Sequence, residues 1–191
     1  MTHHTMTHTK KRLAATAAAT ALVVGAVGVI SAQAASPAAG TTSSGGATAG
    51  TDPADRNLTR STHLTVAAAT KAAQAGLDAA AEEGQKVSVA VVDRNGNTLV
   101  TLRGDGAGPQ SYVSAERKAF TAVSWNAPTS SLAGRLSQAP NLKDIPGTLF
   151  LPGGVPVQSK GAPIAGIGVA GAPSGDLDEK FARAGLAALK Q

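Results

Sequence analysis

The chain has 191 residues with no cysteine, and its 17 basic and 12 acidic residues give a formal net charge of +5. The lack of cysteine excludes disulfides and cysteine-ligated zinc sites. Aromatic residues make up only 3% of the chain, so any core must be packed mainly from Ala, Val, Leu and Gly.

The amino-terminal residues have the pattern of a secretory signal. Lys10-Lys11-Arg12 supplies the positive start, residues 13–30 are uncharged, and Ala32-Gln33-Ala34 matches the small-x-small pattern before a cleavage site. We therefore expect residues 1–34 to be a signal peptide and the mature protein to be secreted and extracellular. An uncleaved membrane anchor is the alternative, because the uncharged stretch is nearly long enough to span a bilayer.

Removal of residues 1–34 changes what the composition implies. It takes away both methionines, three of the four histidines and three basic residues, so the formal net charge falls to +2 and His63 is the remaining histidine. Nucleic-acid binding thereby loses its electrostatic support, and we expect no nucleic-acid partner. A subunit with one imidazole and no thiolate cannot build a zinc cage from His and Cys, so oxygen ligands, His63 or a bound cofactor must carry any metal chemistry.

The rest of the chain divides into a leader and a folded part. Residues 35–56 are rich in Ser, Thr, Gly, Ala and Pro with almost no large apolar side chains, which predicts a flexible leader. Residues 57–191 have the size of one ordinary domain. Because no disulfide can stabilise it, burial or oligomerisation must do so.

The first half of this domain predicts a helix followed by a hairpin. Residues 65–83 are dominated by alanine and free of proline, and Gly84 is a typical stop, so they predict a helix. Residues 87–92 are rich in β-branched side chains and predict a strand. Asn95-Gly96 then favours a type I′ turn, and residues 98–102 return as the partner strand.

The second half predicts two helices, three strands and a closing helix. The helices are expected over residues 110–125, 129–138 and 174–190, and the strands over 148–151, 155–158 and 164–170. The order is helix, strand, strand, helix, helix, strand, strand, strand, helix. Short connections between consecutive strands predict an α+β fold with a mostly antiparallel five-stranded sheet and packed helices.

A glycine motif lies in the last predicted strand. Gly166, Gly168 and Gly171 fit the dinucleotide-binding pattern G-x-G-x-x-G, but they fall within a strand rather than at a turn into a helix. We interpret them as positions where a helix, a cofactor or a second subunit approaches the sheet closely.

Several residues are candidates for ligand or metal binding. Asp176 and Glu179 are three residues apart, hence on one helical face, where two carboxylates could hold iron; the alternative is that acids favour the first turn of a helix because of its dipole. Glu116 lies on a separate helix with no acid three residues before it. His63 is typical of a surface histidine, yet it is also the one imidazole available as an axial haem ligand.

Four motifs together resemble the GlcG/HbpS-like family. They are Val-Ser-Val-Ala-Val-Val-Asp-Arg-Asn-Gly-Asn-Thr-Leu at 87–99, Ser-Ala-Glu-Arg-Lys-Ala-Phe-Thr-Ala at 114–122, Asp-Ile-Pro-Gly-Thr at 144–148, and Gly-Ala-Pro-Ile-Ala-Gly-Ile-Gly-Val-Ala-Gly at 161–171. They occur in order over essentially the whole folded domain. The resemblance implies an α+β subunit in a homo-oligomer, an octamer, that binds haem and iron outside the cell.

The resemblance also implies roles for individual residues and a partner. Thr148 and His63 match haem-linked positions, and Glu116 and the pair Asp176 and Glu179 match acidic iron-binding motifs. Val113 stands where the motif around Glu116 would have its first acid, so only the pair is complete. The implied partner is the extracytoplasmic domain of a sensor histidine kinase that responds to haem or oxidative stress.

The leading hypothesis is therefore a secreted, oligomeric haem- and iron-binding protein that buffers these species and reports them to a membrane sensor kinase. A haem-degrading enzyme is the second hypothesis, although the sequence contains no recognisable catalytic arrangement. The third is a structural or interaction module whose glycine-rich strands make subunit contacts, with binding of a corrinoid or another tetrapyrrole as a variant.

Overall fold

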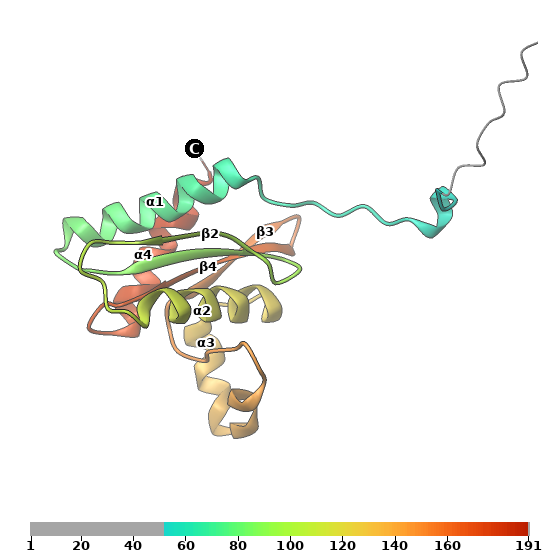
Figure 1. The fold of residues 1–191 in the computed structure, drawn as a ribbon. Helices are drawn as coiled ribbons and strands as arrows, with labels where there is room; N and C mark the ends of the chain where they lie inside the picture. Colours follow the sequence, from blue (N-terminus) through green and yellow to red (C-terminus); the bar gives the residue numbers. More distant parts are fainter. Residues whose placement is uncertain (1–51, 191) are drawn as a thin grey trace, which may run out of the picture. The chain divides into compact units, whose positions relative to one another are not determined.

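The computed structural model describes residues 52–190. The predicted signal peptide, residues 1–34, and the leader up to residue 51 lie outside the described residues. The elements in chain order are η1 (Asp55–Asn57), α1 (Val66–Glu82), β1 (Ser88–Asp93), β2 (Thr98–Arg103), α2 (Ser111–Trp125), α3 (Thr129–Ala133), η2 (Gly134–Ser137), η3 (Pro140–Asp144), β3 (Gly154–Ser159), β4 (Ala162–Ala170) and α4 (Gly175–Ala188) (Figure 1).

Helices α1 and α4 each begin at a residue whose side chain caps the helix. Thr65 precedes α1 and its side chain accepts a hydrogen bond from the backbone N–H of Ala68, at 3.1 Å. Ser174 does the same for α4 with the N–H of Leu177, at 3.3 Å. Such caps satisfy backbone donors that have no partner inside the helix. The predicted stop at Gly84 is confirmed, because α1 ends just before this residue, which has a φ of 67°.

The sheet has the strand order β2-β1-β4-β3, and every neighbouring pair is antiparallel. Helices α1 and α4 pack on each other and cover one face, whereas α2 covers the other face (Figure 1). The predicted α+β class with an antiparallel sheet is confirmed. The sheet therefore separates two layers, one of two helices and one of a single helix.

The prediction of five strands is wrong, because residues 148–151 do not join the sheet. The backbone N–H of Leu149 donates instead to the side chain of Thr121 on α2, at 2.7 Å. Phe150 packs against Trp125 on the same helix in an edge-to-face contact with ring centroids 5.1 Å apart. This apolar segment is thus held by α2 rather than by strand pairing.

Two local predictions also require correction. The hairpin after β1 is not a type I′ turn. That turn requires a positive φ at both Asn95 and Gly96, but only Gly96 has one, of 89°. The type I′ conformation occurs at Lys160 and Gly161, between β3 and β4, where φ is 51° and 81°. The helix expected over residues 129–138 is α-helical only to Ala133 and continues as the tighter η2.

The two faces of the sheet are packed with side chains of different size. On the side of α1 and α4, the core contains fully buried aliphatic and aromatic side chains such as Val89, Val91, Ile167 and Phe181. On the side of α2, the facing positions of β4 are Gly166, Gly168 and Ala170, and the helix presents mainly alanines. Small residues on both surfaces bring the α2 backbone directly against the sheet.

The glycines of β4 are required by this close contact. A Cβ atom at Gly168 would overlap the carbonyl oxygen of Ala115 and lie 2.5 Å from the backbone nitrogen of Ala119. A Cβ atom at Gly166 would overlap the carbonyl oxygen of Ala119. The interpretation that the glycines of this motif allow a close approach is confirmed for Gly166 and Gly168, and the element that approaches them is α2.

We predict that Gly168→Ala lowers the free energy of unfolding by about 1–3 kcal/mol or more, because the added methyl group must push α2 away from β4. Gly134→Ala is the matched control, since Gly134 has a φ of −62° and a Cβ there would meet no atom within 4 Å. Urea unfolding of both variants measures the difference. Equal stability of the two variants would contradict the proposed contact.

Candidate functional site

The predicted haem position Thr148 is buried beside a shallow pocket. Only 2% of Thr148 is exposed, and its hydroxyl donates to the carbonyl oxygen of Ile145, at 2.8 Å. Its own carbonyl oxygen accepts a hydrogen bond from the guanidinium of Arg117, at 2.8 Å. The neighbouring residue Gly147 lines a pocket of about 200 Å³. The hydroxyl therefore belongs to a turn, and it reaches a ligand only when this turn opens.

The same pocket contains the predicted iron ligand Glu116. The lining residues are Val92, Gly96, Thr98, Glu116, Arg117, Phe120 and Gly147. The carboxylate of Glu116 accepts a hydrogen bond from the hydroxyl of Thr101 on β2, at 2.8 Å. The structure thus brings the surroundings of Thr148 and Glu116 together, although they are predicted for different ligands.

The third predicted residue, His63, lies just before α1 and is exposed. Its Nε2 atom shares a hydrogen bond of 2.6 Å with the hydroxyl of Ser61. The charge of His63 also acts on Asp93, the last residue of β1. Because Gly96 in the following turn lines the pocket near Thr148, His63 and this pocket lie towards the same end of the sheet.

Asp93 organises the hairpin at this end. Its carboxylate accepts hydrogen bonds from the backbone N–H groups of Asn95 and Asn97, both at 2.8 Å, and from the side-chain amide of Asn97, at 3.1 Å. Burial acts to raise the pKa of Asp93, but the hydrogen bonds from Asn97 and Asn95 and the nearby charge of His63 outweigh it. They hold the pKa of this carboxyl group below its ordinary value of 3.8.

The predicted iron pair Asp176 and Glu179 lines a separate pocket of about 290 Å³ on α4. Asp176 is exposed, but Glu179 is only 6% exposed and already has several partners. It accepts hydrogen bonds from the backbone N–H and the hydroxyl of Ser130, at 3.1 and 2.8 Å, and pairs with Arg183 at 2.6 Å. Glu179 therefore ties α4 to the start of α3, and a metal ion would compete with these partners.

A buried ion pair that the sequence reading did not identify joins α2 to α4. Lys118 Nζ lies 2.7 Å from Asp178 Oδ2, and each side chain is 5% exposed. Lys118 also donates to the carbonyl oxygen of Val169 on β4, at 3.0 Å. Burial raises the pKa of Asp178, although Lys118 and the backbone N–H groups of Ala172 and Gly171 oppose this effect. The pair thus connects helices that lie on opposite faces of the sheet (Figure 1).

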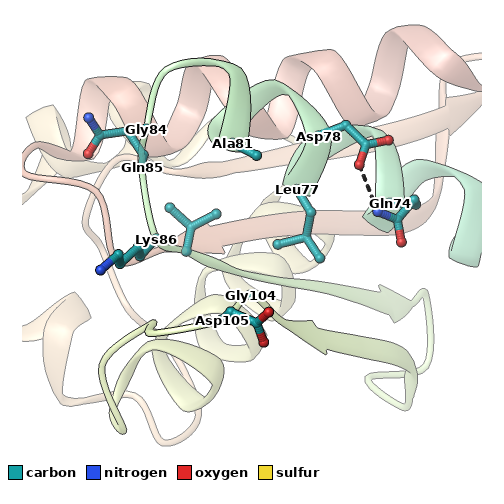
Figure 2. A pocket seen from close by; sticks show the side chains of 10 residues that line it. Gln74, Leu77, Asp78, Ala81, Gly84, Gln85, Lys86, Gly104 and Asp105 are labelled. Atoms are coloured by element: carbon teal, nitrogen blue, oxygen red, sulfur yellow. Dashed lines mark hydrogen bonds between the residues drawn. The ribbon is translucent and has the colours of Figure 1, made fainter.

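A pocket larger than these two contains none of the predicted site residues. It has a volume of about 390 Å³ and lies between the end of α1 and the beginning of β1 (Figure 2). Its polar side chains are Gln74, Asp78, Gln85, Lys86 and Asp105, and Gln74 donates to Asp78 at 2.7 Å. Gly104 at the end of β2 places this pocket at the opposite end of the sheet from the hairpin turn.

Residues 52–190 contain no group of three or more His, Asp and Glu side chains arranged to hold a metal ion. Each of the predicted iron sites therefore offers at most two carboxylates in one subunit. In the same part of the chain, no helix combines the length and the apolar character needed to cross a bilayer.

Residues 64–187 match the family model described as haem degrading protein HbpS-like. Among solved structures, a double mutant of HbpS from Streptomyces reticuli is 75% identical, with 74% of this chain and 97% of that chain covered and a TM-score of 0.72. Another crystal structure of HbpS is 77% identical, with 71% and 96% covered and a TM-score of 0.71. A complex of PduOC with haem is 25% identical, with 66% and 95% covered and a TM-score of 0.61. No curated protein sequence matches the chain significantly.

We predict that Asp93 makes stability depend on acid pH. Because its pKa is lower in the folded than in the unfolded protein, its contribution is complete above the ordinary value of 3.8 and is lost as the pH falls through the folded pKa. Asp93→Asn should lower the free energy of unfolding at pH 7 by about 1–2 kcal/mol and flatten the decline below pH 4. Urea unfolding between pH 2.5 and 7 measures both effects.

The control for this prediction is Asp105→Asn, which changes an exposed aspartate at the opposite end of the sheet. It should retain the acid-dependent decline of the unmodified protein. A decline in Asp93→Asn as steep as in the control would show that the hairpin carboxylate is not its source.

Proposed function

The chain belongs to the family described as haem degrading protein HbpS-like, and on this premise we propose that it is a self-associating protein that binds haem and iron. The observation that carries the proposal is the family match over residues 64–187 together with the buried Thr148 beside a pocket lined by Phe120, Arg117 and Glu116. The haem complex of the related PduOC supports the choice of ligand.

The donor set of the chain fits a weak and reversible haem site. Thr148 offers a hydroxyl oxygen and His63 an exposed imidazole, and a hydroxyl is a poorer iron ligand than an imidazole. Haem would supply a redox-active iron centre, while Thr148 and His63 would supply ligand atoms and Phe120 an apolar ring beside it. Because only 2% of Thr148 is exposed, ligation requires the turn before Thr148 to open. This requirement favours capture and release over permanent cofactor use.

The pair Asp176 and Glu179 is the proposed site for iron without porphyrin. Two carboxylates three residues apart on α4 suit ferric ion as hard oxygen ligands. Ser130 and Arg183 now occupy the oxygens of Glu179, so iron binding must displace Arg183. Two carboxylates leave the coordination of iron incomplete, and further ligands would come from water or from another subunit.

The wider role follows from the family resemblance and the predicted export signal. We propose that the mature chain is exported, assembles into an octamer, and reports haem or oxidative stress to the extracytoplasmic domain of a sensor histidine kinase. The mass of the secreted product tests cleavage after residue 34. Size-exclusion chromatography with light scattering, with and without haemin, tests assembly.

Haem degradation is the second candidate function, and the family description favours it. An enzyme would release iron and lose the Soret absorbance of haem catalytically when a reductant is supplied. Bleaching that stops after one equivalent would identify a binding protein instead. Titration with a corrinoid in place of haemin tests the remaining alternative, a general tetrapyrrole-binding module.

We predict that haemin added to the purified protein shifts its Soret band and that Thr148→Val weakens binding by about tenfold, because the ligand oxygen is lost while the shape is kept. Thr70→Val is the matched control, since the hydroxyl of Thr70 also donates to a carbonyl oxygen but Thr70 is exposed on α1. A haemin titration followed by absorbance measures each dissociation constant. Failure of the unmodified protein to shift the Soret band would refute the haem part of the proposal.

We predict that Glu179→Gln abolishes ferric-ion binding on α4, whereas Arg183→Gln strengthens it by about two- to fivefold because the competing cation is removed. Titration with ferric nitrilotriacetate followed by the fluorescence of Trp125, the single tryptophan, measures both variants. Glu82→Gln, a change of an exposed glutamate on α1, serves as the control. Identical affinities in all variants would place iron elsewhere.

A further inference from the structure

The ring of Phe120 lines the pocket beside Thr148. It is held between two turns, because a Cβ at Gly96 would lie 2.9 Å from one edge of the ring and a Cβ at Gly147 would lie 3.5 Å from the other. Both glycines have positive φ values, of 89° and 80°. The hairpin turn and the turn before Thr148 thus leave an aromatic surface accessible between them.

Arg117 lies next to this ring and is fixed by one contact. One terminal nitrogen donates to the carbonyl oxygen of Thr148, at 2.8 Å. Within residues 52–190, no carboxylate forms an ion pair with Arg117, and its other N–H groups bond to no protein atom. The side chain is exposed, so these donors face the pocket and solvent.

The other charged groups around α2 are already engaged. Glu116, the one acid that lines the pocket, accepts a hydrogen bond from Thr101, and Lys118 is paired with Asp178 inside the protein. Arg103 donates to the carbonyl oxygen of Ala107. Arg117 therefore supplies the available cationic donors at a pocket that is also lined by the aromatic ring of Phe120.

We propose that Arg117 binds a carboxylate of the porphyrin while Phe120 contacts the edge of its ring, an inference that rests on the proposed haem-binding function. A guanidinium held by one hydrogen bond presents its remaining donors in a planar fork that matches a carboxylate. The pocket of about 200 Å³ accommodates one carboxylate arm and part of the ring, so the rest of the porphyrin extends over the surface. Occupation of Arg117 also acts on the carbonyl of Thr148, and so couples carboxylate recognition to the turn that must open.

The test compares haemin with iron protoporphyrin dimethyl ester, which lacks both carboxylates, by absorbance titration in detergent at one ionic strength. The proteins are the unmodified chain, Arg117→Gln and Lys86→Gln, of which the last removes a cation from the large pocket at the other end of the sheet. We expect Arg117→Gln to bind haemin about tenfold more weakly than the unmodified chain and to bind the ester equally well. Lys86→Gln should match the unmodified chain with both ligands.

The outcomes separate this inference from the function on which it rests. Equal haemin affinity of Arg117→Gln and the unmodified chain overturns the role of Arg117 while haem binding stands. An equal loss of affinity for haemin and the ester also overturns it, because the effect would then not involve the carboxylate. If the unmodified chain binds neither ligand, the proposed function itself fails. Thermal unfolding of Arg117→Gln and of Arg117→Lys shows whether a lower haemin affinity comes from the lost carboxylate contact or from loss of folding.

Discussion

The contact between the backbone of α2 and the glycines of β4 positions most of the domain. Gly166 and Gly168 leave no side chain between the strand and the helix, so the backbone of α2 lies directly against the sheet. Residues of α2 then place the other parts: Thr121 holds Leu149, Lys118 reaches Asp178, and Phe120 reaches the turns at Gly96 and Gly147. A domain poor in aromatic residues thus gains its order from close backbone contact.

Much of the fold follows from local sequence patterns. The alanine-rich stretch before Gly84 and the alternation around residues 87–102 predict α1 and the first hairpin because helix propensity and strand periodicity agree there with tertiary packing. The segment 148–151 is apolar enough for a strand, yet Thr121 and Trp125 bind it instead. The type I′ turn lies at Lys160-Gly161 rather than Asn95-Gly96, because Asp93 accepts the backbone N–H groups of the first turn and selects another conformation.

The candidate site is less visible in the sequence, because its parts come from separate elements. Thr148 and Glu116 carry motif signals, but only the structure places them around one pocket. Arg117 and Phe120 have no individual signal, since an arginine and a half-buried phenylalanine on a helix are common. Conversely, Asp176 and Glu179 form a convincing sequence pair, and the structure adds that Glu179 is already bound by Ser130 and Arg183. Spacing along a helix predicts that two side chains share a face, but it does not show which other residues contact them.

The ion pair between Lys118 and Asp178 constrains how this sequence can diverge. Loss of either partner leaves a lone charge enclosed by protein, which is far more costly than replacing both with apolar groups. A substitution at one position is therefore tolerated only when the other changes at nearly the same time. Descendants of this chain should retain the two residues together or lose them together, and this joint inheritance would be visible as covariation between α2 and α4.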